Sequence, residues 1–318
     1  MKAAVIAYYH KEIKTEINAF LNSKGIECRF FRRVPIDDKK EMEYLSNVEI
    51  LLADPGRIID VLPKFKKLRW LQSTWAGIET ISDLDQIISG KITVTNLKRT
   101  FGELISEYVM GYIFAIHRNF FQHYENQKQK TWRSIGYDRL ADKTIGLIGT
   151  GGIGSEIARK CFAFGMRTFG LNRTGNPVPA IDKIFRKNRK HEFFKECDIV
   201  VMTLPHTNET NNLVDKKWFD QMKRGTLFIN AGRGKTVVQD DLINALKSGK
   251  VGTAVLDVFE DEPLSAESEL WNMKNVYITP HVAGITFPDE VVKIWKANID
   301  RYINGEALLN ITNPKRGY

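Results

Sequence analysis

Cysteine is scarce, with three residues in a chain of 318. Cys28, Cys161 and Cys197 are far apart and form no C-x-x-C pair. An odd number at such spacing argues against disulfides and a zinc site. We therefore expect buried, reduced thiols rather than disulfides, metal ligands or a nucleophile, and the sequence predicts no metal site.

Long apolar runs are also absent. The most apolar stretch, 108–116, is far shorter than the ~20 residues of a membrane-spanning helix. Residues 1–9 are too short for a signal peptide with a cleavage site and are typical of a first strand. With 43% hydrophobic and 27% charged residues, the composition predicts a cytoplasmic globular protein without a membrane partner. A chain of this length is longer than one hydrophobic core usually supports, which predicts two domains.

Positive charge predominates, because 47 Lys and Arg outnumber 38 Asp and Glu and give a net charge of +9. The basic residues are scattered over amphipathic segments. Their two dense runs, 64–69 and 186–190, belong to no nucleic-acid-binding module, so a nucleic-acid partner is disfavoured. A positive field suits small anionic substrates and a phosphorylated cofactor, although a solvated basic surface accounts for most of the excess.

The first hundred residues alternate between apolar and charged segments, a pattern typical of βαβ units and a parallel sheet. No glycine fingerprint follows the first strand, so this region should bind something other than a dinucleotide. We predict strands at 3–8, 27–31, 50–53, 70–73 and 92–95, separated by helical segments at 12–23, 57–65 and 81–88.

A single long helix is predicted over 101–129. Leu104, Tyr108, Gly111 and Ile113-Phe114 give it an apolar side too broad for a solvent-facing helix, so it should pack on a neighbouring subunit or bridge the domains. Further strands are predicted at 144–148, 167–171, 199–203, 226–229, 253–258 and 276–278, and a final helix over 289–303 should return to the first domain.

The strand at 144–148 runs into a G-x-G-x-x-G loop, and a helix follows over 155–162. Gly149 permits a tight turn, Gly151 lets the backbone approach a pyrophosphate, and Gly154 lets the helix lie close to the strand. Such a loop also occurs in a turn that merely needs glycine, but the strand before it and the helix after it favour a dinucleotide site.

Three later strands each lead into an ionisable group: Arg233, Glu262 and His281. Ligands of open α/β sheets bind at the carboxyl ends of strands, so these side chains should meet. Arginine can hold a carboxylate and polarise a carbonyl, and histidine beside a carboxylate can donate a proton. Singly, each has a plainer reading: a surface arginine, a loop carboxylate or a structural histidine. Asp257 lies inside the predicted strand, where a carboxylate is costly without a nicotinamide or backbone partner.

Together, these motifs resemble the D-isomer-specific 2-hydroxyacid dehydrogenases, which include the glyoxylate/hydroxypyruvate reductases. The similarity is continuous from about residue 70 to the C-terminus. The segments that carry it are Gly149–Gly154, Asn230-Ala231-Gly232-Arg233-Gly234, Ala254–Leu264 with its Asp257 and Glu262, and Thr279-Pro280-His281.

The resemblance implies two doubly wound parallel-sheet domains with the active site in their cleft. The flavodoxin-like substrate domain would comprise 1–97 plus 286–318, and the Rossmann dinucleotide-binding domain 98–285. A homodimer through 101–129 and its neighbours is also implied, with Trp132 reaching the partner's active site by analogy.

The resemblance also implies the roles of particular residues. Arg233, Glu262 and His281 would be catalytic, with Glu262 orienting His281. Substrate would contact Arg233 and the loop of Trp75, Ala76 and Gly77. The implied cofactor contacts are Gly149, Gly151, Gly152, Ile153, Asn172, Arg173, Thr174, Leu204, Pro205, Ala231 and Asp257.

The sequence departs from NAD-preferring relatives at the end of the strand 167–171. Those relatives carry an acid there that binds the ribose 2′-hydroxyl, whereas this chain has Asn172, Arg173 and Thr174. The missing carboxylate removes repulsion against a 2′-phosphate, which Arg173 is suited to bind. The alternative is that Arg173 only stacks on adenine. We predict NADP(H) as the preferred cofactor, with NAD(H) possible.

The sequence thus predicts NAD(P)H-dependent reduction of a small anionic 2-oxo acid, such as glyoxylate or hydroxypyruvate, to a D-2-hydroxy acid. Formate-type oxidation is disfavoured because those relatives lack the Glu262 equivalent. The alternative from another class is a non-catalytic dinucleotide-sensing protein, since some relatives act as corepressors. The presence of Arg233, Glu262 and His281 favours turnover.

Overall fold

The computed structural model describes residues 1–98 and 100–313. The chain divides into two units, one comprising Met1–Thr100 with the segment from Thr286 on, and the other comprising Phe101–Ile285. Residues 99 and 314–318, which fall within the two predicted domains, lie outside the described residues. No helix in the described part of the chain is long and apolar enough to cross a bilayer.

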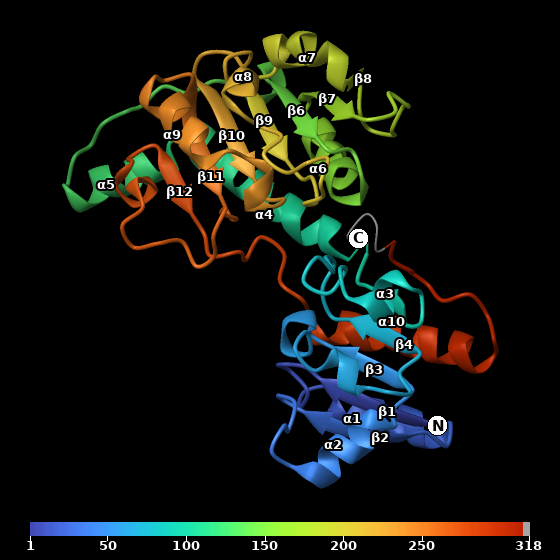
Figure 1. Ribbon diagram of the computed structural model, residues 1–318. Coiled ribbons are helices and arrows are strands. Elements are labelled where there is room, and N and C mark those ends of the chain that lie inside the picture. Colours follow the sequence, from blue (N-terminus) through green and yellow to red (C-terminus); the bar gives the residue numbers. More distant parts are fainter. Residues whose placement is uncertain (99, 314–318) are drawn as a thin grey trace. The chain divides into compact units, whose positions relative to one another are not determined.

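The first unit holds a five-stranded sheet whose strands are all parallel (Figure 1). Its order, β2-β1-β3-β4-β5, is the flavodoxin-like doubly wound order. All of β3 and β4 and all of β1 after Lys2 are buried because helices cover both faces of the sheet. The elements are β1 (Lys2–Ile6), α1 (Lys14–Ser23), β2 (Glu27–Phe31), α2 (Lys39–Ser46), β3 (Ile50–Ala53), β4 (Trp70–Ser73), α3 (Asp85–Ile88), β5 (Thr93–Thr95) and α10 (Pro288–Ile303).

The C-terminal helix α10 belongs to this first unit although the second unit precedes it in sequence. Proline at its start has the backbone angle that a first helical turn needs. Trp295 and Ile299 of α10 are buried, α10 packs against α1, and Tyr302 stacks on Trp70 of β4 at 5.4 Å between ring centroids. Helix α10 thus contributes side chains to the hydrophobic core of the first unit.

The second unit holds a seven-stranded parallel sheet in the order β12-β11-β10-β9-β6-β7-β8. The strand order reverses between β6 and β9, and a ligand is expected to bind at such a reversal. The strands are β6 (Thr144–Ile148), β7 (Arg167–Asn172), β8 (Lys183–Arg186), β9 (Ile199–Met202), β10 (Thr226–Asn230), β11 (Val251–Leu256) and β12 (Val276–Ile278). The helices are α4 (Phe101–His117), α5 (Phe120–Lys128), α6 (Gly152–Ala163), α7 (Lys190–Glu196), α8 (Lys216–Phe219) and α9 (Gln239–Lys247).

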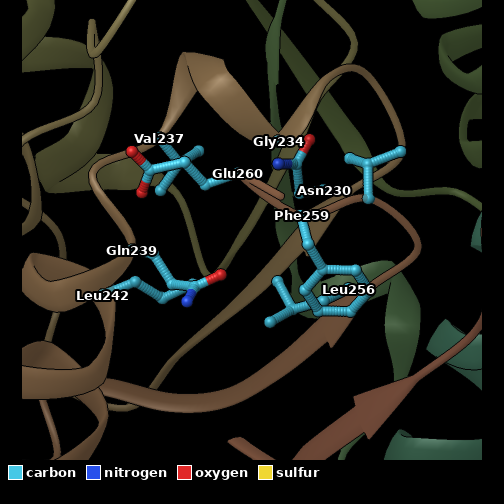
Figure 2. A pocket seen from close by; sticks show the side chains of 9 residues that line it. Asn230, Gly234, Val237, Gln239, Leu242, Leu256, Phe259 and Glu260 are labelled. Atoms are coloured by element: carbon cyan, nitrogen blue, oxygen red, sulfur yellow. The ribbon is translucent and has the colours of Figure 1, made fainter. Parts of the chain in front are cut away.

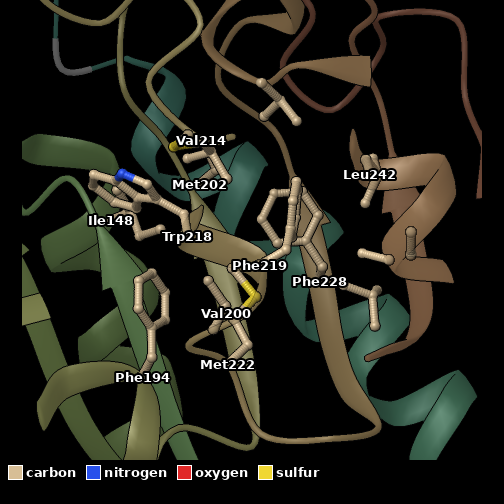
Figure 3. Close-up of a cluster of buried hydrophobic side chains, with 14 of the residues drawn as sticks. Ile148, Phe194, Val200, Met202, Val214, Trp218, Phe219, Met222, Phe228 and Leu242 are labelled. Carbon is tan, nitrogen blue, oxygen red and sulfur yellow. The ribbon is translucent and has the colours of Figure 1, made fainter. Parts of the chain in front are cut away.

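Helices α7, α8 and α9 bury one face of this sheet. Figure 3 shows Phe194, Trp218 and Phe219 from the helices packed over Val200 and Phe228 from the strands. Successive rings along this layer meet edge to face, which is a favoured geometry for aromatic pairs. On the other face α4 packs against α6. Strands buried on both sides form a rigid platform for the loops at their carboxyl ends.

The prediction of one helix over 101–129 was wrong. Helix α4 ends at His117, and α5 begins at Phe120 after Asn119, whose φ of 55° lies in the left-handed region. Asparagine adopts this conformation more readily than other non-glycine residues and commonly ends helices. The Asn119 side chain also donates to the carbonyl of Gly136 at 3.0 Å. A long-range hydrogen bond thus helps to fix a break that apolar periodicity did not reveal.

Several other predicted boundaries also differ from the structure. The segment 57–65 contains short 3-10 turns instead of a helix, since Pro63 lacks an N–H, and the helix predicted at 81–88 forms only over Asp85–Ile88. Strand β8 was missed because its four residues mix charged and apolar side chains. Strand β11 ends at Leu256, so Asp257 follows the strand instead of lying within it.

The three cysteines are free thiols, as predicted. Cys161 and Cys197 are buried and Cys28 is partly buried. Burial raises the pKa of Cys161 to about 12 and also raises the pKa of Cys28 and Cys197. A thiol held in its protonated form is a poor nucleophile, so the three cysteines have a packing role.

Candidate active site

The glycine loop joins β6 to α6 at the strand-order reversal of the second unit. Gly149 has a φ of 102°, and a Cβ on Gly154 would overlap the carbonyl oxygen of Gly149. A Cβ on Gly151, by contrast, would meet no atom within 4 Å. Glycine at position 151 therefore leaves open space beside the loop. A pyrophosphate needs such space to approach the backbone closely.

The first turn of α6 offers unused hydrogen-bond donors. Among the described residues, no hydrogen bond uses the N–H groups of Gly151, Gly152 or Ile153. Such groups at a helix N-terminus carry partial positive charge and bind anions. Together with the space beside Gly151, they fit the pyrophosphate of a dinucleotide.

The loop after β9 lies beside the glycine loop. A Cβ on Gly149 would come within 3.1 Å of the Leu204 side chain, and the backbone of Leu204 also touches Gly232. The Pro205 carbonyl accepts a hydrogen bond from Thr210 at 2.7 Å, which closes this loop on itself. Ala231, at the end of β10, donates to β9 through its backbone. The fold thus brings the predicted cofactor residues Leu204, Pro205 and Ala231 next to the fingerprint.

The loop after β7 begins with an exposed cation, Arg173, and no carboxylate stands at 173–175. Among the described residues, Arg173 has one ion-pair partner, the exposed Glu209 at 3.8 Å. The side chain of Asn172 is engaged within the protein, accepting from Gly175 N–H at 2.6 Å and donating to Thr150 at 2.9 Å. Asn172 therefore braces the loop that presents Arg173.

A second arginine at this loop was not predicted as a site residue. Arg186, at the end of β8, donates through Nε to the Thr174 carbonyl at 2.9 Å, and its side chain packs on Gly175. The basic run 186–190 was visible in the sequence, but only the pairing of β8 with β7 brings it to the ribose end of the sheet. The positive charge here is therefore larger than Arg173 alone supplies.

Two glycines on either side of Arg233 hold its loop against neighbouring strands. A Cβ on Gly234 would overlap the backbone of Phe259, so the loops after β10 and β11 can approach this closely only because position 234 is glycine. Arg233 Nη1 donates to the carbonyl of Gly232 at 2.9 Å, which fixes one end of the guanidinium.

A small surface pocket adjoins this loop but does not include the glycine loop or His281. In Figure 2 the side chain of Phe259 lies next to Leu256. Because most of the lining is apolar and none of the predicted catalytic side chains contributes to it, we assign the pocket no ligand. It is lined by Asn230, Gly234, Val237, Gln239, Leu242, Leu256, Val258, Phe259 and Glu260.

His281 and Glu262 form a hydrogen-bonded pair. Nδ1 of His281 lies 2.8 Å from Oε2 of Glu262, while Oε1 accepts from the backbone N–H of Phe259 at 3.0 Å. An ionised carboxylate only accepts hydrogen bonds, so Nδ1 carries the proton and Nε2 is the ring nitrogen left for chemistry. The imidazole is half exposed. An oriented, accessible histidine backed by a carboxylate is suited to proton transfer.

Asp257 is buried, with 2% of its surface exposed. Its carboxylate accepts from the N–H groups of Val282 and Ala283 at 2.8 and 2.9 Å and from the Thr279 hydroxyl at 2.6 Å. Its carbonyl accepts from His281 N–H at 2.8 Å. The backbone partners considered for Asp257 are thus present, and its predicted contact with the cofactor stays a prediction.

In the first unit, the loop after β4 presents two backbone donors. Trp75 N–H is held by Ser73 Oγ at 3.0 Å, and the Ala76 carbonyl accepts from Asn96. No hydrogen bond in the described part of the chain uses the N–H groups of Ala76 and Gly77. The exposed ring of Trp75 lies close to Gly56. These donors have the chemistry to bind a carboxylate.

The glycine cradle and the histidine–carboxylate pair define a dinucleotide-dependent oxidoreductase. Residues 110–283 match the family model described as "D-isomer specific 2-hydroxyacid dehydrogenase, NAD binding domain". This chain belongs to the D-isomer specific 2-hydroxyacid dehydrogenase family, so the predicted family, fold class and enzyme class are confirmed.

Solved structures agree with this assignment over the whole chain. A family member from Aeromonas salmonicida subsp. salmonicida A449 is 32% identical, with a TM-score of 0.91 over 98% of this chain and 99% of that one. An NADPH-dependent glyoxylate/hydroxypyruvate reductase from Sinorhizobium meliloti, in complex with NADP and sulfate, is 28% identical, with a TM-score of 0.85 over 100% and 99%. A family member from Xanthobacter autotrophicus Py2, in complex with NADPH and MES, is 27% identical, with the same TM-score and coverage.

Proposed function

We propose that this enzyme reduces a small 2-oxo acid, such as glyoxylate or hydroxypyruvate, to the D-2-hydroxy acid with NADPH. The observation that carries the proposal is the 2.8 Å pair of His281 and Glu262 in the same unit as the glycine cradle. The similar enzyme from Sinorhizobium meliloti, which is named for this reaction, supports the choice of substrate.

Each residue has a defined task in this reaction. Bound NADPH supplies the hydride that reduces the carbonyl carbon. Arg233 holds the substrate carboxylate and polarises the carbonyl, and the N–H groups of Ala76 and Gly77 in the first unit are further donors with the chemistry to bind a carboxylate. His281 donates the Nε2 proton to the forming alkoxide, and Glu262 stabilises the imidazolium and fixes the orientation of the ring. The products are the 2-hydroxy acid and NADP⁺.

NADPH is proposed as the preferred cofactor because β7 leads into Arg173 and no carboxylate follows it before Gly175. The guanidinium would pair with the 2′-phosphate, while the N–H groups of Gly151, Gly152 and Ile153 would hold the pyrophosphate. NADH lacks the 2′-phosphate and would bind more weakly through the remaining contacts. The cofactor-bound relatives, which hold NADP or NADPH, support this preference.

A panel of 2-oxo acids assayed with NADPH and with NADH tests the proposed activity. We expect turnover of glyoxylate or hydroxypyruvate, with a higher kcat/KM for NADPH, and chiral analysis of a product such as glycerate should give the D-isomer. NADPH binding without turnover of any 2-oxo acid would instead favour a dinucleotide sensor. A preference for NADH would contradict the cofactor assignment.

We also propose that the enzyme is a homodimer through α5 and the chain that follows it. Phe120, Tyr124 and the fully exposed Trp132 present apolar surface that nothing in the described chain covers. An apolar patch of this kind marks an interaction site. By analogy with its relatives, Trp132 would then reach the partner's substrate site.

Light scattering should give twice the chain mass for the wild type. Phe120→Lys should shift the protein toward monomer, whereas Ile36→Lys, at an exposed apolar residue of the first unit, should leave a dimer. Trp132→Ala should leave the dimer intact and raise the KM for the 2-oxo acid. A wild-type monomer would contradict the proposal.

A further inference from the structure

Tyr108 lies in the middle of α4, far in sequence from the catalytic loop, yet its hydroxyl is 2.7 Å from Oγ1 of Thr279. Thr279 in turn is 2.6 Å from Oδ1 of Asp257. The three side chains form a continuous hydrogen-bonded chain from α4 to the carboxylate. Asp257, the last of the three, binds the backbone of the loop that carries His281.

The carboxylate of Asp257 determines which group donates in each of these hydrogen bonds. An ionised Asp257 carboxylate can only accept, so Thr279 uses its single hydroxyl proton there. Its oxygen must therefore accept from Tyr108, which donates. Burial raises the pKa of the Tyr108 hydroxyl above its ordinary value, so the proton is retained for this bond over the working pH range.

The loop that the chain supports is held in a conformation that few residues adopt. His281 has a φ of 55°, in the left-handed region. This conformation is unfavourable for a residue with a Cβ and persists only where the surroundings enforce it. The hydrogen bonds that enforce it converge on Asp257, from the N–H groups of His281, Val282 and Ala283.

We propose that Tyr108 is a positioning residue for His281, acting through Thr279 and Asp257. The hydroxyl of Tyr108 completes the bonding of Thr279, Thr279 fixes one oxygen of Asp257, and Asp257 holds the loop that aims Nδ1 at Glu262. The inference rests on the proposed role of His281 as the proton donor. It adds α4 to the elements that determine catalysis, and it gives a role to the partly buried hydroxyl of Tyr108, which substrate chemistry does not need.

Aromatic packing holds Tyr108 in place from the side. Tyr108 lies 4.9 Å from Tyr112 between ring centroids, and Tyr112 lies 6.1 Å from Tyr277 in β12, two residues before Thr279. Phe121 of α5 stacks on Tyr277 at 4.3 Å. The rings keep α4 and β12 together, so removal of one hydroxyl should not displace either element.

The decisive variants are Tyr108→Phe and Thr279→Val, each of which removes one hydroxyl with little change of shape. Thr279→Ser keeps the hydroxyl and is the comparison for Thr279→Val. Loss of alignment at a reacting group costs up to about 100-fold. We expect kcat to fall about 10-fold in Tyr108→Phe and about 100-fold in Thr279→Val, and Thr279→Ser to restore most of it. The dissociation constant for NADPH should stay within about twofold of wild type in all three.

A pH profile separates positioning from a general loss of packing. If the loop loosens, Glu262 stabilises the imidazolium less, and the fall of kcat on the alkaline side should move to lower pH. Tyr277→Phe is the matched control, because its hydroxyl makes no hydrogen bond within the described residues, and it should leave kcat and the profile unchanged. Wild-type kcat in Tyr108→Phe or in Thr279→Val, or equal losses in Thr279→Ser and Thr279→Val, would overturn the proposal.

Histidine-selective ¹⁵N NMR tests positioning without relying on turnover. The His281 ring signals, assigned by their loss in His281→Asn, should shift in Tyr108→Phe and Thr279→Val and stay in place in Tyr277→Phe. If the enzyme is inactive on every 2-oxo acid, the proposed function is refuted, but the His281 ring signals can still be compared between the variants. Unchanged His281 signals in an active enzyme would refute the positioning role alone.

Discussion

Replacement of His281 by asparagine is expected to lower kcat for 2-oxo acid reduction by about 10²- to 10⁴-fold, the usual contribution of a positioned general acid. Asparagine is chosen because it tolerates the left-handed conformation that residue 281 adopts, with a φ of 55°. Alanine would add backbone strain to the loss of the imidazole. The asparagine variant therefore reports on the proton donor with little disturbance of the loop.

The measurement is the rate of nicotinamide absorbance loss at saturating NADPH, together with the dissociation constant for NADPH by fluorescence. The dissociation constant should change by no more than about twofold, since the imidazole acts mainly in the transition state. His191→Asn, at an exposed histidine of α7, is the control and should behave as wild type. A near-normal kcat in His281→Asn would show that another group donates the proton.

Glu262→Gln should give an intermediate loss in the same assay. Glutamine can still accept from the N–H of Phe259 through its amide oxygen, but its amide nitrogen would then face Nδ1 of His281. Without the negative charge the imidazolium is less stabilised, so the fall of kcat with rising pH should begin at a lower pH. An unchanged pH profile in Glu262→Gln would separate Glu262 from the function of His281.

Arg173→Ala is expected to weaken NADPH binding by a factor of about 10 to 150 while changing NADH binding by no more than about twofold. The factor corresponds to the roughly 1.5–3 kcal/mol of a hydrogen bond to a charged group. NADH has no 2′-phosphate, so it should lose only the weak contribution of a nearby cation. Fluorescence titration of each variant with both cofactors measures the two constants directly.

The control for Arg173→Ala is Arg139→Ala, which removes the same charge from an exposed position outside the cofactor loops. Glu209→Gln provides a test in the opposite direction. It removes the carboxylate that pairs with Arg173 at 3.8 Å, so NADPH should bind more tightly. Equal losses of NADPH and NADH in Arg173→Ala would indicate stacking on adenine and would contradict the assignment to the 2′-phosphate.

Local features of the sequence were sufficient to predict much of the fold. Strands 27–31, 50–53, 70–73 and 276–278 were confirmed at their exact bounds because each is a short apolar or β-prone run between turn residues. The glycine loop was recognisable because its chemistry is local: a strand, three spaced glycines and a helix follow one another in the chain. Where a conformation depended on distant partners, as at Asn119, prediction failed.

The sequence by itself determined the family, the two parallel sheets and the residue types available at the strand ends. Only the tertiary structure decided how those residues are held. The pairing of β8 with β7 brings Arg186 to the cofactor loop, and the packing of α4 on its unit brings Tyr108 to Thr279, 171 positions later in the chain. Periodicity reports which face of an element is buried, whereas a hydrogen bond between distant elements depends on the three-dimensional arrangement of both, which no local pattern encodes.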